Sequence, residues 1–432
     1  MQSRVLSVEL PGLAGQQVLL QGWVHRIRDF GGVRFLVLRD RTGLAQVVIP
    51  SNVDVGDIGC EWTVSVTGCC RAEARAPAGV EVLANAVSGI SPAQTPPLEV
   101  FSPHAAEKNR PETLLEHRAI SLRIPDVLDV FRVHAVVLEA FRAYLRGQGF
   151  TEIVTSKLVL AGAEGGSAVF RVEYYDGAAY LAQSPQFYKQ MMVGSGLERV
   201  FETGHAYRAE KSETSRHLTE YLSLDFEMGF IESEQDVMHM HTGLIRAIFQ
   251  AANEQCASIL QQRGVNLPQI REIPQVAFPQ ARQVLQEKFG KTHGLEGDLD
   301  TEGERLICQW AQEEFGSELL FVTGYHIGNR PVYTMPKEDE PPLTRSFDLL
   351  FRGVEITTGG QRIHDYQQLV ESIRSRGLAP TAYEGYLECF KHGMCPHGGM
   401  GMGIERLLMQ MLGLSNIKEA CLFPRDRNRL VP

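Results

Sequence analysis

The sequence has little that marks a membrane-bound or secreted protein. None of its apolar runs approaches the roughly 20 residues that a helix needs to span a bilayer. The first residues, MQSRVLSVELPGLAGQQ, lack the apolar stretch of a signal peptide. The eight cysteines include no C-x-x-C pair, so we interpret them as buried thiols in a reducing compartment. These absences predict a cytoplasmic protein.

A metal cluster is also poorly supported. One local group of cysteine and histidine exists, made of Cys389, His392, Cys395 and His397. Its spacing is tighter than in the usual zinc sites, and the sequence offers no second half of such a site. With 432 residues, of which 44% are hydrophobic, the chain should instead form two or three ordinary soluble domains around large cores.

The sequence lacks an excess of positive charge. Its net charge of −10 does not by itself favour a nucleic-acid partner, because phosphate contacts need lysine and arginine. Local patches matter more than the total, and one is present near the N-terminus. Phe30 and Phe35 stand among five arginines at positions 26, 28, 34, 39 and 41. Arginine for phosphates and bases, with aromatic rings for stacking, suits single-stranded RNA.

Residues 1–95 are rich in short strand-like runs. These are VLLQGWVHRIRD, VRFLVLRD, LAQVVIP, EWTVSVTGCCRAE and VEVLANAVSGISP. Five such runs, separated by turn residues, predict a small Greek-key barrel of the oligonucleotide-binding (OB) type. Phe35 lies between alternating apolar residues, so a place in the barrel core is the alternative to RNA stacking.

The rest of the chain is predicted to be of the α+β class. Residues 96–120 are polar and contain several prolines, which favours a hinge between domains. Apolar residues then recur at helical spacing from Val127 to Leu145, and GFTEIVTSKLVL follows as a strand. We expect residues 121–432 to form an antiparallel sheet flanked by helices, with a mostly helical insertion at about 235–340. A Ser-x-x-Asp capping box at Ser233 starts that segment.

The most informative stretch is residues 200–230, VFETGHAYRAEKSETSRHLTEYLSLDFEMGF. Apolar residues from Leu222 to Phe230 alternate with polar ones, which predicts a half-buried strand. Residues 200–210 are a plausible partner strand. The connecting loop carries Lys211, Arg216 and His217, which suits a polyanion such as a nucleoside triphosphate. A solvated loop without function is the alternative.

Two later stretches carry further candidates. In RSFDLLFRGVEITTGGQR, Asp348 and Glu355 could bind a hard divalent cation through oxygen, although each could also be a structural carboxylate. In GGMGMGIERLL, a glycine-rich segment precedes a helix. We expect these glycines to let the backbone lie flat against a planar base. Arg406, in the first turn, could hold a phosphate or form a surface salt bridge.

Together these motifs resemble the class II aminoacyl-tRNA synthetases, and most closely the archaeal-type aspartyl-tRNA synthetases. RAE, RHLTEY and DFEM resemble motif 2, GGMGMGIERLL resembles motif 3, and VEITTGGQRIHDY resembles the strand between them. The helix at 127–145 with the strand after it resembles motif 1, which implies a homodimer. The chain departs from the family at Ser156 and Cys395, where proline is usual, and at Thr358, where serine is usual.

The resemblance implies an ATP-dependent ligase that attaches L-aspartate to tRNA through an aspartyl-adenylate. It assigns catalysis to Arg208, Glu355 and Arg406, and Mg²⁺ binding to Glu355 with Asp348 or Thr358. The implied aspartate-binding residues are Glu164, Ser184, Gln186, Lys189, Arg208, Asp225, Thr358 and Arg362. The implied ATP-binding residues are Arg208, Ala209, Glu210, Arg216, His217, Leu218, Glu355, Gly403, Ile404, Glu405 and Arg406.

Charge gives a reason for aspartate rather than asparagine. Arg362 can grip a carboxylate with two hydrogen bonds, and Lys189 can add a point charge. Asparagine would leave both cations poorly paired in a buried site.

The barrel has implied roles in reading the anticodon. The resemblance assigns base stacking to Phe35 and a hydrogen bond to Gln46, with Arg28 nearby. His25 and Pro77 stand where strict enzymes carry tryptophan and lysine, which resembles the non-discriminating form that charges both tRNA(Asp) and tRNA(Asn). The mischarged product would pass to a tRNA-dependent amidotransferase. Neutral drift at these two positions is the alternative.

Three other functions compete with this interpretation. They are a discriminating aspartyl-tRNA synthetase, an asparagine synthetase-like paralog, and a non-catalytic RNA-binding protein. The paralog usually lacks an anticodon barrel, and the non-catalytic protein would be expected to lose Arg208, Glu355 or Arg406.

Overall fold

The structure is a computed structural model that describes residues 3–102, 104–160, 169–209, 214–294 and 297–431. The chain divides into two compact units, Met1–Asp126 and Val127–Pro432. No helix in the described residues is long and apolar enough to cross a membrane.

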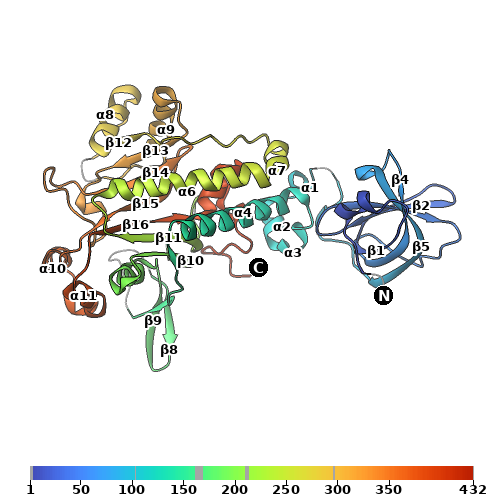
Figure 1. Ribbon diagram of the computed structural model, residues 1–432, viewed down its shortest axis with the longest axis horizontal. Coiled ribbons are helices and arrows are strands. Elements are labelled where there is room, and N and C mark those ends of the chain that lie inside the picture. The colour runs from blue at the N-terminus through green and yellow to red at the C-terminus, as the bar shows by residue number, and fades with distance from the viewer. Residues whose placement is uncertain (1–2, 103, 161–168, 210–213, 295–296, 432) are drawn as a thin grey trace. The chain divides into compact units, whose positions relative to one another are not determined.

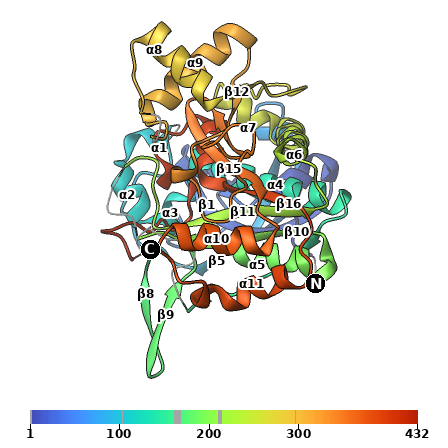
Figure 2. The ribbon, with the colours of Figure 1, turned by 90° about the vertical axis from the view of Figure 1, so that its left-hand side faces the viewer.

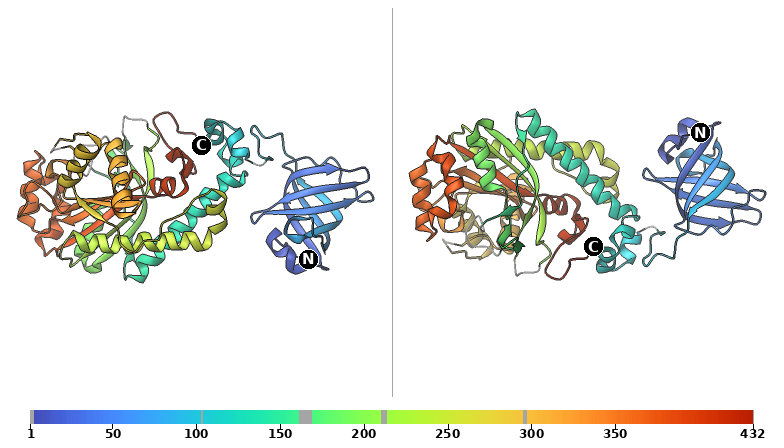
Figure 3. Two further views of the ribbon diagram at one scale, coloured as in Figure 1. Left: turned by 90° about the horizontal axis from the view of Figure 1, so that it is seen from above. Right: turned by 90° about the horizontal axis from the view of Figure 1, so that it is seen from below.

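The first unit contains the predicted five-stranded barrel (Figures 1 and 3). Its strands are β1 (Gln17–Asp29), β2 (Val33–Arg39), β3 (Leu44–Pro50), β4 (Thr63–Ala72) and β5 (Val80–Ser91), closed in the order β1-β2-β3-β5-β4. Alternate residues such as Val18, Leu20, Leu36 and Leu38 fill its core. Two 3₁₀ helices, η1 (Ser7–Leu13) and η2 (Pro77–Gly79), also belong to this unit. The α+β class with an N-terminal OB barrel is therefore confirmed.

The segment expected to be a hinge contains regular structure. Residues 96–120 carry α1 (Ala105–Lys108), α2 (Pro111–Glu116) and the first part of α3 (Arg118–Ser121). These short helices belong to the first unit, whose boundary falls at Asp126. The role of the segment as a hinge stays a prediction.

The second unit is built on an eight-stranded sheet, ordered β12-β13-β14-β15-β16-β11-β10-β6 (Figure 1). Its strands are β6 (Thr151–Glu152), β10 (Arg199–Tyr207), β11 (Glu220–Gly229), β12 (Gln275–Ala277), β13 (Leu319–Thr323), β14 (Ser346–Phe351), β15 (Val354–Arg362) and β16 (His397–Gly403). The inner pairings are antiparallel, and only the two outermost strands pair in parallel. A separate small sheet contains β7 (Leu158–Val159), β9 (Gly177–Leu181) and β8 (Arg171–Tyr174).

Long helices cover one face of the large sheet. The helices α4 (Pro125–Gly147), α6 (Glu234–Gln255) and α12 (Ile404–Leu412) share one buried cluster with apolar residues of β11, β14, β15 and β16. The predicted apolar stripe of α4 is confirmed, since Val130, Val137 and Phe141 are buried. The predicted capping box at Ser233 is confirmed at the start of α6.

Further helices complete the unit. They are α5 (Gln186–Met192), η3 (Val193–Leu197), α7 (Ala257–Gln262), α8 (Phe278–Phe289), α9 (Thr301–Phe315), η4 (Ile327–Asn329), α10 (Tyr366–Ser375), η5 (Pro380–Tyr383), α11 (Glu384–Lys391) and η6 (Ile417–Ala420). Figure 2 shows α5, α10 and α11 grouped together, and a second apolar cluster joins them.

Besides its helices, the segment 235–340 contains β12 and β13, which extend the main sheet, and every residue of β13 is buried. Two local expectations need correction. The run GFTEIVTSKLVL forms two strands of two residues each rather than one long strand. In β11 both faces are buried, and Phe230 leaves the apolar face with φ +57° and 71% exposure.

Candidate functional site

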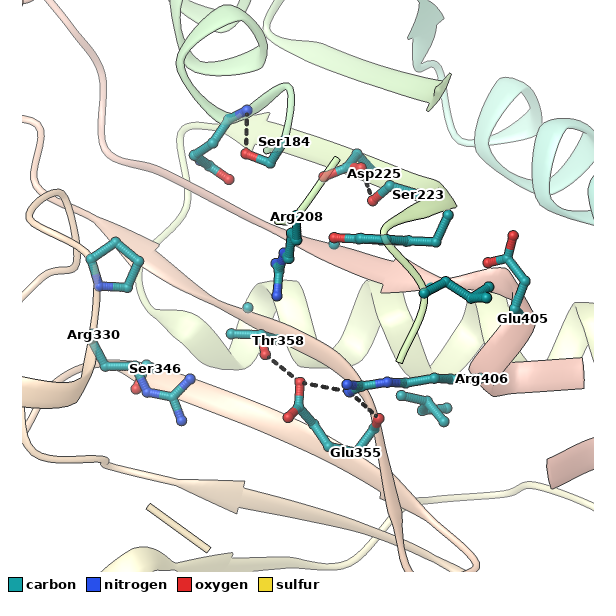
Figure 4. A pocket seen from close by; sticks show the side chains of 18 of the residues that line it. Ser184, Arg208, Ser223, Asp225, Arg330, Ser346, Glu355, Thr358, Glu405 and Arg406 are labelled. Carbon is teal, nitrogen blue, oxygen red and sulfur yellow. Dashed lines mark hydrogen bonds and ion pairs between the residues drawn. The ribbon is translucent and has the colours of Figure 1, made fainter. Parts of the chain in front are cut away.

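The sheet face opposite the long helices carries a polar cavity (Figure 4). Its described lining is Ser184, Gln186, Arg208, Arg216, His217, Leu218, Tyr221, Ser223, Asp225, Arg330, Pro331, Tyr333, Thr334, Ser346, Glu355, Ile356, Thr358, Gly359, Arg362, Gly401, Gly403, Glu405, Arg406 and Ile417. Most of the residues expected to bind aspartate or ATP are among them. The segments that supply them span more than 200 positions of the sequence, and the sheet brings them together.

Six expected residues are not part of the described lining. Lys189 and Asp348 are buried behind it, Ile404 lies in the core, and Ala209 precedes the undescribed part of its loop. Glu164 and Glu210 lie outside the described residues.

Strand alternation places acidic side chains on the cavity face of β11. Ser223, Asp225 and Glu227 point away from the apolar face, and each is no more than 5% exposed. The neighbouring strand β16 pairs Gly401 with Asp225 and Gly399 with Glu227. A Cβ atom on Gly399 would lie 2.2 Å from Oε2 of Glu227. The glycines of β16 thus make room for buried carboxylates. This explanation of the glycine-rich sequence differs from the flat contact with a base that we expected.

One end of the cavity, the Arg362 end, contains Ser184, Gln186, Asp225 and Arg362. Arg362 donates from Nε to Oε1 of Glu227 at 2.9 Å and from Nη2 to the carbonyl oxygen of Gly399 at 2.9 Å. These contacts fix the plane of the guanidinium. Burial acts to raise the pKa of Glu227, but the adjacent Arg362 and Lys189 outweigh it and lower that pKa. The pair is therefore ionised in the folded protein.

Lys189 supports this end from behind. Its ammonium lies 3.0 Å from Oδ1 of Asp225 and 3.3 Å from Oε2 of Glu227, and it donates to the carbonyl oxygen of Met400 at 2.8 Å. Ser223 donates to the other oxygen of Asp225 at 2.5 Å. Lys189 therefore reaches the cavity through Asp225, and its direct contact with a ligand stays a prediction.

The other end, the Arg406 end, contains Arg216, Glu355, Thr358 and Arg406. Thr358 donates its hydroxyl to Oε1 of Glu355 at 2.9 Å, and Arg406 donates from Nη1 to the Glu355 carbonyl oxygen at 3.0 Å. The Arg406 Nη1 atom also lies 3.7 Å from Oε1 of Glu355 (Figure 4). Burial acts to raise the pKa of Glu355, but Arg406, Thr358 and two further arginines lower it overall. Glu355 is therefore an anion that faces the cavity.

Arg208 lies between the two ends. Its guanidinium is above the ring of Tyr221 at 5.5 Å, and its backbone is held by a hydrogen bond from its amide to the carbonyl oxygen of Thr219 at 2.9 Å. In Figure 4, Ser184 and Asp225 are on one side of Arg208, and Glu355 and Arg406 are on the other. A ligand with charge at two places could thus contact this one cation from both ends.

Asp348 is placed differently from the expectation. Both of its carboxylate oxygens accept from Arg330, at 2.9 and 2.6 Å, and Arg330 in turn lies 3.7 Å from the centre of the Tyr325 ring. Burial raises the pKa of Asp348 to about 6, against the opposing effect of Arg330. Arg330, rather than Asp348, lines the cavity.

The described residues include no group of three or more histidine, cysteine or acidic side chains suited to a metal ion. The Glu355 carboxylate and the Thr358 hydroxyl still provide hard oxygen donors at the cavity surface. Mg²⁺ usually takes one or two carboxylates and completes its shell with water and phosphate oxygens. These residues therefore fit a magnesium ion that arrives with a phosphate ligand.

The remaining residues with an expected ATP contact have protein partners here. Arg216 donates to Oε2 of Glu304 and to the Thr301 hydroxyl, and His217 Nδ1 lies 2.6 Å from the Thr214 hydroxyl. The Glu405 carboxylate accepts from the Leu222 amide at 3.0 Å, which secures the start of β11. Burial raises the pKa of Glu405 to about 7.

Sequence reasoning missed Glu227, Glu304 and Arg330. Glu227 had a detectable signal, because it belongs to the polar face of the alternating strand. Glu304 and Arg330 had none, since both lie in the segment expected to be a mostly helical insertion.

Four of the expected anticodon residues, His25, Arg28, Phe35 and Gln46, lie on β1, β2 and β3 and outside the buried core of the barrel. Phe35 is half-buried, lies opposite Arg28 in the β1–β2 register, and packs edge to face against Phe30. It is therefore not a core residue. Gln46 donates to Glu81 at 2.8 Å. His25 stands at a β-bulge between Val24 and Arg26, and its Nδ1 lies 3.3 Å from Nη1 of Arg39. Pro77 begins η2.

Comparisons with known proteins agree with this architecture. A family model described as "tRNA synthetases class II (D, K and N)" matches residues 110–427, and one described as "OB-fold nucleic acid binding domain" matches residues 18–87. The aspartate–tRNA(Asp/Asn) ligase of Thermus thermophilus is 46% identical, covering 99% of this chain and 100% of that protein. The Deinococcus radiodurans protein of the same name is 47% identical, with 99% of each chain covered.

A solved structure has the same fold over its full length. The asparaginyl-tRNA synthetase of Pyrococcus horikoshii, complexed with asparaginyl-adenylate, matches with a TM-score of 0.93 and 33% identity, and 100% of both chains is covered.

Proposed function

Because the chain belongs to the class II tRNA synthetases of the D, K and N group, we propose that it attaches L-aspartate to tRNA by way of an aspartyl-adenylate. An oxygen of the aspartate α-carboxylate attacks the α-phosphorus of ATP, and pyrophosphate leaves. The 3′-terminal adenosine of tRNA then attacks the activated carbonyl carbon through a hydroxyl group, and AMP leaves. The relatives named as aspartate–tRNA(Asp/Asn) ligases support this substrate pair.

The observation that carries the proposal is the position of Arg208 between the two ends of one cavity. Neither step requires a side chain as nucleophile, so catalysis depends on positioning and on neutralising charge. Arg208 bridges the reacting carboxylate and the α-phosphate. Arg406 and Arg216 hold the outer phosphates. Mg²⁺, bound through Glu355 and the Thr358 hydroxyl, would neutralise further phosphate charge.

Aspartate is selected at the Arg362 end. The hydrogen bonds of Arg362 to described residues use Nε and Nη2, which leaves Nη1 for the side-chain carboxylate of the substrate. Glu227 holds the guanidinium in this orientation. Asparagine offers a neutral amide instead, which leaves a buried cation without its anion. Asp225 is placed to receive the ammonium group of the substrate.

The barrel accepts both tRNA(Asp) and tRNA(Asn), whose anticodons differ only at the third base. Phe35 stacks on a base, which its half-buried place on the outer surface permits. His25 and Pro77 leave the third base without the tryptophan and lysine of strict enzymes. Aspartyl-tRNA(Asn) then passes to a tRNA-dependent amidotransferase, and the enzyme works as a cytoplasmic homodimer.

Two assays test this function. Purified enzyme should catalyse ATP–pyrophosphate exchange that depends on aspartate, with asparagine at least about 100-fold less effective. It should then charge purified tRNA(Asp) and tRNA(Asn) with aspartate at similar rates. Charging of tRNA(Asp) alone would support the discriminating enzyme, and asparagine made without tRNA would support the paralog. Absence of aspartate-dependent ATP–pyrophosphate exchange would support the non-catalytic RNA-binding protein.

A further inference from the structure

The carboxylate of Glu304 joins three segments of the second unit. Glu304 lies in the first turn of α9, and its side chain is 9% exposed. Its Oε2 atom accepts from Nη1 of Arg216 at 2.7 Å and from the backbone amide of Glu355 at 3.1 Å. One oxygen thus connects α9 with a cation of the β10–β11 loop and with the start of β15.

The same turn of α9 holds the second nitrogen of Arg216. The Thr301 hydroxyl lies 2.6 Å from Nη2, so Glu304 and Thr301 together fix both terminal nitrogens of the guanidinium. Arg216 lines the cavity in this position. Because an arginine side chain loses much rotamer freedom on binding, holding it beforehand lowers the entropic cost of contacting a ligand.

Glu304 also constrains Glu355. The peptide groups of Glu355 are held on both sides, since its amide donates to Glu304 and its carbonyl oxygen accepts from Arg406. The Glu355 carboxylate is therefore presented to the cavity from a fixed backbone.

We propose that Glu304 is a positioning residue for ATP, which acts by holding Arg216 and the Glu355 backbone at the Arg406 end of the cavity. This inference rests on the proposed function, because it takes ATP as the ligand of that end. It makes α9 part of the nucleotide site rather than a peripheral addition. The alternative is that the ion pair only stabilises the fold, in which case its loss would affect both substrates alike.

The test compares Glu304→Gln with Glu314→Gln. Glu314 is exposed near the end of the same helix, so it controls for the loss of one negative charge. In aspartate-dependent pyrophosphate exchange, Glu304→Gln should raise the KM for ATP about tenfold and change the KM for aspartate less than about twofold. The control should change neither. Equal changes in both KM values, no change, or a lower KM for ATP would overturn the proposal.

Direct binding keeps this result separate from the proposed function. Calorimetry with Mg²⁺ and a non-hydrolysable α,β-methylene analogue of ATP should show about tenfold weaker binding to Glu304→Gln. If wild-type protein binds the analogue but shows no aspartate-dependent exchange, the proposed function fails. The role of Glu304 is then still decided by the affinity of the variant for the analogue. Unchanged analogue binding would contradict the role of Glu304.

Two further variants guard against a folding defect. Thr301→Val removes one hydrogen bond to Arg216 and leaves Glu304 in place, and it should raise the KM for ATP about threefold. The double variant of Glu304→Gln and Arg216→Gln should lose less free energy of ATP binding than the two single variants lose in sum, because both changes remove the same contact. Fully additive effects would show that Glu304 does not act through Arg216.

Discussion

The Arg362 end and the Arg406 end of the cavity differ in how their charges are held. At the Arg362 end the side chains of Lys189, Glu227 and Arg362 are 1%, 0% and 6% exposed, and cations alternate with anions. At the Arg406 end Glu355 is 34% exposed and Arg406 is 25% exposed, with 3.7 Å between their charged groups. The first end is closed and set in advance, whereas at the second the Glu355–Arg406 pair is open and can be exchanged, while Arg216 stays fixed by Glu304.

This difference suits the two ligands that we propose. A small amino acid must be distinguished from an isostere that differs in one group, and a rigid, buried set of charges makes a poor match costly. A triphosphate with its metal ion is large and strongly charged, and it suits a fixed cation such as Arg216 together with a cation such as Arg406 that can leave its resting partner. Under this proposal the tight Arg362 end provides selection, and the Arg406 end provides charge neutralisation.

The largest effect is expected where the two ends meet. Arg208→Ala should lower the rate of aspartate-dependent pyrophosphate exchange by about 10²–10³-fold, because it removes the cation that we propose contacts both reacting groups. Steady-state exchange assays measure this. Arg199→Ala, which removes a partly buried arginine at the start of β10 and outside the cavity lining, serves as the control and should retain activity. Full exchange activity in Arg208→Ala would rule out the central position of this residue.

A stability comparison sharpens the contrast between closed and open ends. Glu227→Gln should lower the free energy of unfolding by about 3 kcal/mol, because it leaves Lys189 and Arg362 as buried cations with too few anions. Glu355→Gln should lower it by less than about 1 kcal/mol, since its ion pair is partly solvated. Urea denaturation measures both. Equal costs would show that the two ends do not differ as described.

At the open end, Arg406→Leu should raise the KM for ATP about tenfold, because it removes one charge-assisted contact with a phosphate. The KM for aspartate should change less than about twofold. Initial rates with each substrate varied in turn give both values. A larger rise in the KM for aspartate than in the KM for ATP would contradict the division of the cavity into two ends.

The smallest effect concerns pH. Burial raises the pKa of Glu405 from an ordinary value of 4.5 to about 7, so the folded protein holds this proton more tightly than the unfolded chain. The contribution to stability is complete below pH 4.5 and is lost as the pH rises to about 7. The difference in the free energy of unfolding between Glu405→Gln and wild type should therefore shift in favour of the variant from pH 5 to pH 8, by on the order of 1 kcal/mol. Urea unfolding curves at both pH values measure this. A difference between variant and wild type that is the same at pH 5 and pH 8 would show that Glu405 titrates normally.

The sequence predicted those features that local patterns encode. Alternation identified β11, helical spacing identified α4, and five strand-like runs identified the barrel. The motif resemblance pointed to most of the cavity lining, including Arg208, Arg362 and Arg406. Roles assigned by that resemblance stay predictions, but the fold does bring these three arginines to one cavity.

Features that depend on long-range pairing could not be predicted. Arg330 meets Asp348, and Glu304 meets Arg216, only because β13 and β14 bring the helical segment against the sheet. No periodicity in 290–330 signals these contacts. The burial of the polar face of β11 could not be predicted either. Alternation normally indicates that one face is exposed to solvent, whereas here that face lies at the cavity beside the glycines of β16.

The most direct test of the two-ended cavity is Arg362→Leu, with Michaelis constants measured for both substrates in the pyrophosphate exchange assay. Selection of aspartate by a fixed guanidinium predicts that the KM for aspartate rises about 100-fold while that for ATP changes less than about threefold. Equal changes in the two constants would contradict the assignment of this end to the amino acid.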